Sequence, residues 1–113
     1  MSDQHTTVSE LREIVQQFVA ARNWETFHSP KNLAMSIAIE AAELMEHFQW
    51  RTIPESREVV TDPATLNEIT EEVADVLSYT LAIANALNLD LSTALRNKMV
   101  KNAIKYPEGG TSF

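Results

Sequence analysis

The chain has 113 residues and 44% apolar content, enough for one domain with its own core and too little for two. The absence of cysteine excludes disulfides, thiolate zinc sites and cysteine nucleophiles, and a formal charge of -7 opposes binding to nucleic-acid polymers. Only two glycines are present, so a glycine-rich phosphate loop is excluded, and a bound phosphate must be held by side chains or a metal ion.

The N-terminal residues 1–7 are polar and lack the apolar segment of a signal peptide. The most apolar stretch, 33–44, is interrupted by Glu40 and Glu43 and is much shorter than the roughly 20 uncharged residues of a membrane span. We therefore expect a soluble, cytoplasmic protein without a membrane partner. The lack of cysteine permits such a reducing compartment.

The first predicted element is an amphipathic helix at residues 7–22. Thr7 and Glu10 form a capping-box pattern, and the apolar residues after them recur at helical spacing. A loop at residues 23–29 follows this helix.

The second predicted helix starts at Ser29 and Pro30, because serine can cap a helix and proline loses no hydrogen bond at the first position. It runs to about Trp50. Apolar residues surround it on nearly every side, as in a helix buried by several neighbours, and Glu40 and Glu43 are the exceptions. These apolar residues are Leu33, Met35, Ile37, Ile39, Leu44, Met45 and Phe48.

The second half of the chain is also predicted to be helical. The polar segment 51–61 is expected to hold a short helix around residues 56–60. An Asp–Pro step then begins a long helix at 63–87, and Asp90 caps a last helix at 91–106 that ends at a proline.

Four long helices with short connections predict an all-α fold of the four-helix-bundle type. We treat residues 1–113 as a single domain in which 1–6 and 108–113 are flexible tails. The second helix has more apolar surface than one chain would cover, so we expect a homodimer or a dimer of dimers.

Two pairs of acidic residues lie three residues apart within the predicted helices, so each pair projects from one helical face. Glu40 and Glu43 belong to the second helix, and Glu72 and Asp75 belong to the helix at 63–87. Four carboxylates among apolar residues repel one another and are costly to bury without a counter-charge. A hard divalent cation, Mg²⁺ or else Mn²⁺, suits such all-oxygen ligands.

Two other interpretations of these acidic residues compete with the metal site. A di-iron site in a helical bundle would need Glu-x-x-His steps, and the chain has none, since His47 stands four residues after Glu43. Ordinary solvated helix residues are the plainer alternative, although both pairs have apolar neighbours. On spacing alone, the metal site and the solvated faces stay about equally open.

Four ordered strings of residues extend the acidic pattern along the chain. They are HSPKNL at 28–33, EAAELMEHFQW at 40–50, EEVADVLSY at 71–79 and KMVKNAIKYP at 98–107. Together they resemble the MazG-like nucleotide pyrophosphohydrolases, in particular the branch that includes the dCTP pyrophosphatases. Several ordered motifs are a specific signal, whereas a single Glu-x-x-Glu step would be a weak one.

The resemblance implies Mg²⁺-dependent hydrolysis of a (deoxy)nucleoside triphosphate between its α and β phosphates, which releases a monophosphate and pyrophosphate. In this resemblance the Mg²⁺ ion would be held by Glu40, Glu43, Glu72 and Asp75. Glu40 or Glu43 would serve as the general base. Pyrimidine deoxynucleotides similar to dCTP are the expected substrates, and house-cleaning of the nucleotide pool is the expected role.

The same resemblance suggests residues that contact the phosphates. Lys98 and Asn102 lie one turn apart in the last helix and could reach phosphate oxygens. Lys31 could do so from the N-terminus of the second helix, where backbone N–H groups are free. A solvated basic stripe is the alternative for the first two residues, and a surface salt bridge is the alternative for Lys31.

Aromatic residues are the expected contacts of the base and sugar. The residues that match base- and sugar-contacting positions of similar enzymes are Trp24, His28 and Trp50. Aromatic faces suit this role, since a nucleobase stacks on any flat π surface. Tyr79 falls on the same helical face as Asp75 and could meet the sugar. Core packing of the tryptophans and a buried tyrosine are the alternatives.

Two further classes of function stay open. A non-catalytic nucleotide-binding or regulatory module could keep the aromatic residues and lysines, although it would tolerate incomplete acidic motifs. A purely structural oligomerisation domain would explain amphipathic helices but not acids within apolar runs. Stabilisation by Mg²⁺ separates the enzyme from the structural domain.

Overall fold

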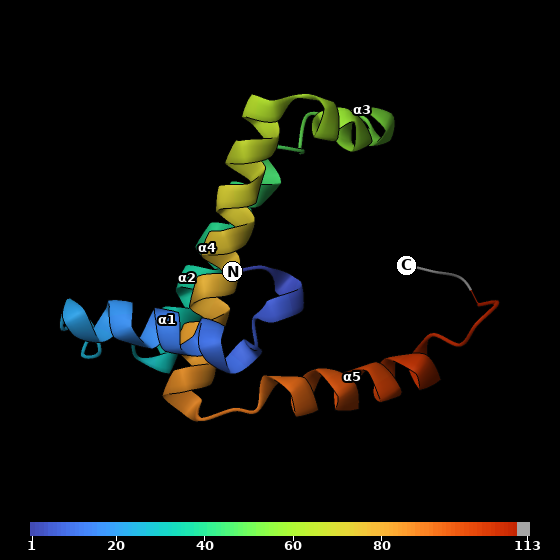
Figure 1. The fold of residues 1–113 in the computed structure, drawn as a ribbon. Helices are drawn as coiled ribbons and strands as arrows, with labels where there is room; N and C mark the ends of the chain where they lie inside the picture. The colour runs from blue at the N-terminus through green and yellow to red at the C-terminus, as the bar shows by residue number, and fades with distance from the viewer. Residues whose placement is uncertain (111–113) are drawn as a thin grey trace.

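The computed structural model describes residues 1–110 of the chain. They form five α-helices and two short 3₁₀ helices, with no β-strand among them, so the predicted all-α fold class is confirmed. In chain order (Figure 1) the elements are η1 (Asp3–His5), α1 (Val8–Ala21), α2 (Pro30–Glu46), α3 (Ile53–Glu58), η2 (Val59–Thr61), α4 (Pro63–Leu87) and α5 (Leu91–Lys105).

The four long helices begin where the sequence predicts, because each start carries a side chain that caps free backbone N–H groups. The hydroxyl of Thr7 accepts a hydrogen bond from the N–H of Glu10 at 3.1 Å, and the Glu10 carboxylate accepts one from the N–H of Thr7. Ser29, Asp62 and Asp90 cap α2, α4 and α5 through their side-chain oxygens.

The connection between α2 and α4 differs from the prediction. The sequence predicts a short helix at 56–60, whereas α3 begins at Ile53. The reason is a second capping box, in which Thr52 and Glu55 exchange hydrogen bonds and so start the helix earlier. α2 also ends sooner than expected, at Glu46, and turns follow it.

The expected flexible tails are only partly described. Residues 1–6 contain η1, and of the segment 108–113 the last three residues, 111–113, lie outside the described part of the chain. The mobility of both segments stays a prediction.

The core lies where α1, α2 and α4 meet. α2 and α4 run side by side in opposite directions, and α1 packs across the second half of α4 (Figure 1). Leu33 of α2 and Ala84 of α4 are almost completely enclosed, with exposed fractions of 1% and 0%. The other buried apolar residues are Val19, Val59, Ile69, Leu81 and Ala82.

α5 does not take part in this core. It follows a left-handed turn at Asn88 (φ 52) and then extends away from the other helices (Figure 1), and none of its residues is buried. The expected four-helix bundle is therefore not closed within one chain, because only three of the four long helices pack together.

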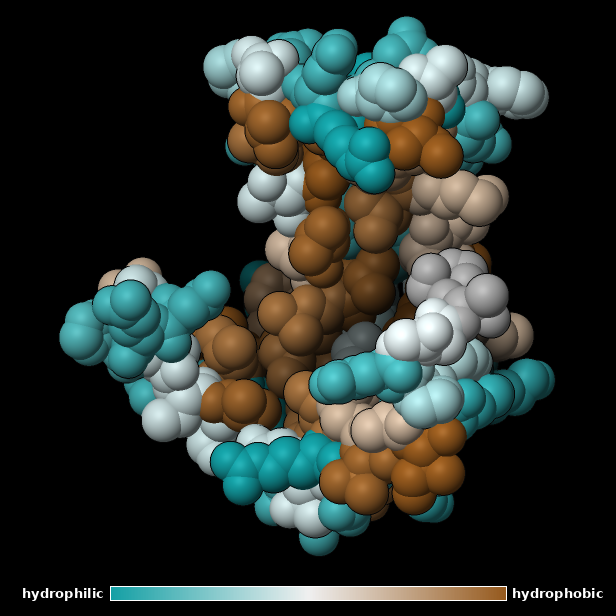
Figure 2. All heavy atoms as spheres, turned by 90° about the vertical axis from the view of Figure 1, so that its right-hand side faces the viewer, coloured by the Kyte–Doolittle hydropathy of each residue, from teal (hydrophilic) through white to brown (hydrophobic). Residues whose placement is uncertain are grey.

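The chain exposes far more surface than a compact monomer. Its accessible area is 8930 Å², whereas a compact monomer of 12.7 kDa would expose about 6,200 Å². Figure 2 shows a continuous hydrophobic hollow, framed by polar residues, on the side toward which α5 projects. Large apolar residues exposed on α2, α4 and α5 include Met35, Ile39, Leu66, Val73, Leu77, Leu95, Met99, Val100 and Ile104.

None of the helices formed by residues 1–110 combines the length and the apolar content needed to cross a membrane.

Candidate active site

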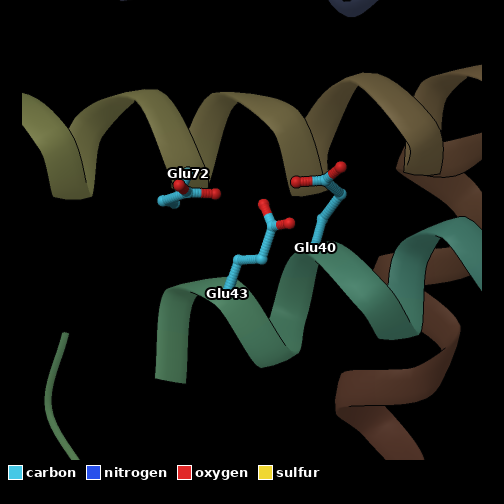
Figure 3. Close-up of side chains that lie close together, drawn as sticks. All are labelled: Glu40, Glu43 and Glu72. Atoms are coloured by element: carbon cyan, nitrogen blue, oxygen red, sulfur yellow. The ribbon is translucent and has the colours of Figure 1, made fainter. Parts of the chain in front are cut away.

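Three of the four predicted carboxylates meet between α2 and α4. Glu40 and Glu43 project from α2 toward α4, where they approach Glu72 (Figure 3), and each of the three offers a carboxylate oxygen within 4.8 Å of the others. We call these three residues the acidic cluster. Asp75 lies one turn after Glu72 on α4 and lines the same pocket as Glu40. Antiparallel packing of two helices thus brings both acidic pairs to one place.

The acidic cluster forms no ion pair with a lysine or arginine among residues 1–110. One oxygen of Glu40 and one of Glu72 are buried without any hydrogen-bond partner among the described residues. Burial, followed by the neighbouring carboxyl groups of Glu43, Asp75 and Glu72, raises the pKa of Glu40 to about 7. Burial and the Glu43 carboxyl also raise the pKa of Glu72.

These properties fit a hard divalent cation. Buried polar atoms are normally hydrogen-bonded, so two orphaned carboxylate oxygens at one point indicate a missing partner. Among the described residues the one ion pair is His47 with Glu68, at 4.0 Å, and no lysine or arginine pairs with the acidic cluster. An all-oxygen, multiply charged ligand set is what Mg²⁺ and Mn²⁺ prefer.

An apolar pocket of about 420 Å³ adjoins the acidic cluster. Its edge carries the carboxylates of Glu40 and Asp75, and the rest is mainly apolar and aromatic. The remaining lining residues are Ile14, Val15, Phe18, Val19, Trp24, His28, Ser78, Tyr79 and Ala82. We call this space the aromatic pocket, since it combines a concave apolar surface with a few polar groups, as small-molecule sites do.

The aromatic side chains of this pocket form a row. The ring centroids of Trp24 and His28 are 5.9 Å apart, and those of His28 and Tyr79 are 6.2 Å apart. Phe18 of α1 meets Trp24 edge to face at 5.6 Å. Nδ1 of His28 is buried and has no hydrogen-bond partner among the described residues.

The wall contributed by α1 was not predicted from the sequence. Ile14, Val15 and Phe18 recur at helical spacing, and that pattern is the same for a core face as for a pocket wall. Ser78 also lines the pocket, and its hydroxyl donates to the Asp75 carbonyl at 2.9 Å. No feature of the sequence marks these residues as part of a site.

Four of the predicted nucleotide contacts lie elsewhere in the single chain. Trp50 follows α2 and is 87% exposed, and Lys31 is exposed in the first turn of α2. Lys98 is exposed and Asn102 half-buried on α5, which extends away from the core (Figure 1). The structure therefore gathers Trp24, His28 and Tyr79 at the pocket but not these four.

The fold and the acidic cluster define an all-α protein with a group of carboxylates, of the kind that could hold a metal ion, between two antiparallel helices. More particularly, the chain belongs to the MazG-like family, whose model matches residues 35–112. This confirms the resemblance found in the sequence.

Proteins similar to this chain in sequence or structure are named as pyrophosphatases. The chain is 38% identical to dCTP pyrophosphatase 1 of Homo sapiens over 101 residues and 37% identical to that of Mus musculus, which covers 89% of this chain. It spans only 59% of the length of these curated relatives. The crystal structure of a pyrophosphatase from Archaeoglobus fulgidus matches with a TM-score of 0.82 and 41% identity, covering 96% of this chain and 99% of that one. The relatives thus carry the class of activity that the sequence predicts for this chain.

Proposed function

We propose that the chain is a nucleoside triphosphate pyrophosphohydrolase, which cleaves between the α and β phosphates to give a monophosphate and pyrophosphate. The observation that carries this proposal is the acidic cluster, with its two unpaired buried oxygens, beside the aromatic pocket. Similar proteins named as pyrophosphatases support the same class of reaction.

The acidic residues would hold Mg²⁺, with Mn²⁺ as a substitute. Glu40, Glu43 and Glu72 offer converging oxygens, and Asp75 adds a fourth carboxylate at the pocket edge. The ion, when bound, neutralises charge on the triphosphate and makes water a stronger acid. Glu40 or Glu43 would then take the proton of the attacking water, since both carboxylates face the space between α2 and α4 (Figure 3).

The aromatic pocket would bind the base and sugar. Its volume of about 420 Å³ falls within the range of small-molecule sites, about 300 to 1,000 Å³. Trp24 and His28 provide flat surfaces for a base, and Tyr79, one turn after Asp75, would meet the sugar nearer the metal. Because the similar proteins are named for dCTP, we expect dCTP-like pyrimidine deoxynucleotides to be preferred, in keeping with a house-cleaning role.

A second copy of the chain would complete the site. Among the residues that the structure describes, no lysine or arginine lines the aromatic pocket, although a triphosphate needs cationic or amide contacts. Lys98 and Asn102 lie on α5, outside the core that holds the acidic cluster. We therefore propose that α5 of one subunit packs over the hydrophobic hollow of another. Lys98 and Asn102 would meet the phosphates there, together with Lys31 and Trp50 at the rim.

The exposed area supports this assembly. The accessible area of the chain, 8930 Å², exceeds that of a compact monomer by about 2,700 Å². An area of this size is in the range that permanent interfaces bury. The radius of gyration, 16.7 Å, also exceeds the roughly 13 Å of a compact domain of this length. A homodimer or a dimer of dimers would cover this surface, and a monomeric mass in light scattering would contradict it.

The test of the activity uses the purified chain with each canonical dNTP and NTP at equal concentration, with Mg²⁺ or with EDTA. Chromatography should show monophosphate plus pyrophosphate only with the metal, and the fastest turnover with dCTP. Release of orthophosphate would contradict the cleavage position. Metal-dependent nucleotide binding without turnover would instead favour a non-catalytic binding module.

A further inference from the structure

A second cluster of side chains, outside the acidic cluster, joins α1 to the end of α4. Nε of Arg12 donates to Oδ1 of Asn85 at 2.9 Å, and Nη2 of Arg12 donates to the carbonyl of Ala84 at 3.1 Å. Nη1 of Arg12 donates to the carbonyl of Leu89, and Nδ2 of Asn85 returns a bond to the carbonyl of Arg12 at 3.1 Å. We call this network the Arg12 clamp.

The Arg12 clamp is unusual for this molecule. All other side-chain hydrogen bonds found among residues 1–110 join groups at most five positions apart. The clamp joins Arg12 to residues 72 to 77 positions away. It is therefore the one side-chain hydrogen-bond network in the described part of the chain that fixes one helix relative to another.

Chemistry explains why an arginine occupies this position. The last carbonyl groups of a helix carry partial negative charge, and the Ala84 carbonyl, which also accepts from the N–H of Leu89 at 2.9 Å, has a second lone pair for a cationic donor. The planar guanidinium presents several N–H groups in a fixed geometry, so one side chain reaches two carbonyls and an amide oxygen together. The clamp thus holds α1, the last turn of α4 and the turn that leads into α5.

The position of Arg12 on α1 links the clamp to the aromatic pocket. Ile14, Val15 and Phe18 lie on the next two turns of α1 and form one wall of that pocket. A smaller hollow of about 270 Å³ lies between the clamp and the pocket, lined by Val15 and Asn85 among others. Because this hollow leaves space between α1 and α4 beside Asn85, the clamp bridges the two helices there and helps to set how far the wall stands from α4.

We propose that Arg12 and Asn85 are positioning residues, which hold the α1 wall at the spacing that the base of the nucleotide requires. This inference rests on the proposed function of the aromatic pocket. The clamp does not touch the acidic cluster, so it acts on nucleotide affinity and not on the hydrolytic step.

The kinetic test uses Arg12→Met, which keeps an unbranched side chain but removes the charge and every donor. With dCTP and Mg²⁺, we expect KM to rise about tenfold or more while kcat stays within about twofold, because the clamp contacts none of the carboxylates of the acidic cluster. Asn85→Ala should act in the same direction, and the double variant should be no worse than Arg12→Met, since both changes break one network. Arg12→Lys should fail to restore KM, because an ammonium group cannot span the three acceptors.

Two control variants separate positioning from stability. Gln17→Ala removes a hydrogen bond that stays within α1, and Thr52→Ala removes the N-cap of α3, remote from the pocket. Both should leave KM unchanged, although Thr52→Ala should lower Tm. If Arg12→Met lowers Tm but leaves KM at the parent value, or lowers kcat alone, the positioning role is refuted.

A second readout does not depend on turnover. In a Trp50→Phe background, acrylamide quenching of fluorescence reports how accessible Trp24 is in the pocket. We expect stronger quenching in Arg12→Met than in the parent, and equal quenching would overturn the proposal. Should the parent hydrolyse no nucleotide, the proposed function fails, whereas the quenching comparison still decides the role of the clamp.

Discussion

Glu40 and Glu72 each bury a carboxylate oxygen that has no hydrogen-bond partner among the described residues. Without a cation, the acidic cluster therefore combines loss of hydration with repulsion between like charges, and both effects weaken the fold. With a cation, the same oxygens become ligands, and binding to the folded chain alone stabilises it. Glu40 and Glu72 would thus destabilise the fold without the metal ion and stabilise it when the ion is bound.

Replacement of Glu72 by Gln tests this dependence. In EDTA, Glu72→Gln should raise Tm, because it removes one repelling charge. With Mg²⁺ it should lack the gain in Tm shown by the parent, which is roughly 10 °C at 100 times the dissociation constant. Turnover should fall by more than about 100-fold, since loss even of a residue that only supports a metal ligand costs about 10- to 100-fold.

The matched control for this variant is Glu46→Gln. Glu46 is exposed at the end of α2 and lies outside the acidic cluster. Its replacement should alter neither the metal response nor the turnover. An equal effect of both substitutions would contradict a site built from the acidic cluster.

The raised pKa of Glu40 predicts a pH dependence of the metal-free chain. Folded Glu40 holds its proton up to about pH 7, whereas the ordinary pKa of a glutamate side chain is 4.5. The folded state therefore binds more protons in this window, and the free energy of unfolding falls as the pH rises from 4.5 to 7. Thermal denaturation in EDTA across this range should show the decline, and Glu40→Gln should flatten it. A Tm that rises over the same range in the parent would argue against the shift.

Some of these residues could be found from the sequence and others could not. Acidic pairs three apart within apolar helices, supported by ordered motifs, predicted the gathering of Glu40, Glu43 and Glu72. Arg12 and Asn85 carry no local signal, because their contact joins parts of the chain 73 residues apart. Such a contact depends on the crossing of α1 and α4, which helical periodicity does not specify.

Among the helices, α5 shows most clearly what local patterns leave undecided. Asp90 and the residues that follow predicted its start and length, and the structure agrees. They did not predict its place, because a sequence with apolar residues at helical spacing packs equally well on its own chain or on another. An isolated helix of 15 residues is only marginally stable in water, so α5 needs a partner surface.

Ile104→Glu in α5 tests that partner. Ile104 is 79% exposed in the single chain, so a charge there has little effect on the chain itself. If α5 packs on a second copy, the buried charge should reduce the molecular mass in light scattering and lower activity. Asn97→Glu adds the same charge to the same helix at an exposed polar position and is the control. Unchanged mass in both variants would remove α5 from the interface.

At the scale of the whole molecule, the acidic cluster and two of the proposed phosphate contacts stand on different helices, of which α5 does not join the core. α2 and α4 hold the cluster, whereas Lys98 and Asn102 stand on α5. If activity requires α5 of a second copy, specific activity should fall on dilution as the assembly dissociates. The measurement is turnover per chain against protein concentration, beside sedimentation velocity at the same concentrations. Constant activity through a complete loss of oligomer would show that one chain suffices.

Charge is distributed as unevenly as hydrophobicity between α5 and the rest of the chain. α5 carries four basic residues, Arg96, Lys98, Lys101 and Lys105, and no acidic one, so all sixteen acidic residues lie elsewhere. In the proposed assembly, α5 of one copy would therefore be attracted to the acidic body of the other as they approach, although each whole chain carries a net charge of -7. Such steering is screened within about 10 Å at 0.1 M salt. Ionic strength should consequently set how fast dissociated subunits reassociate, while the apolar contacts decide how long they remain together.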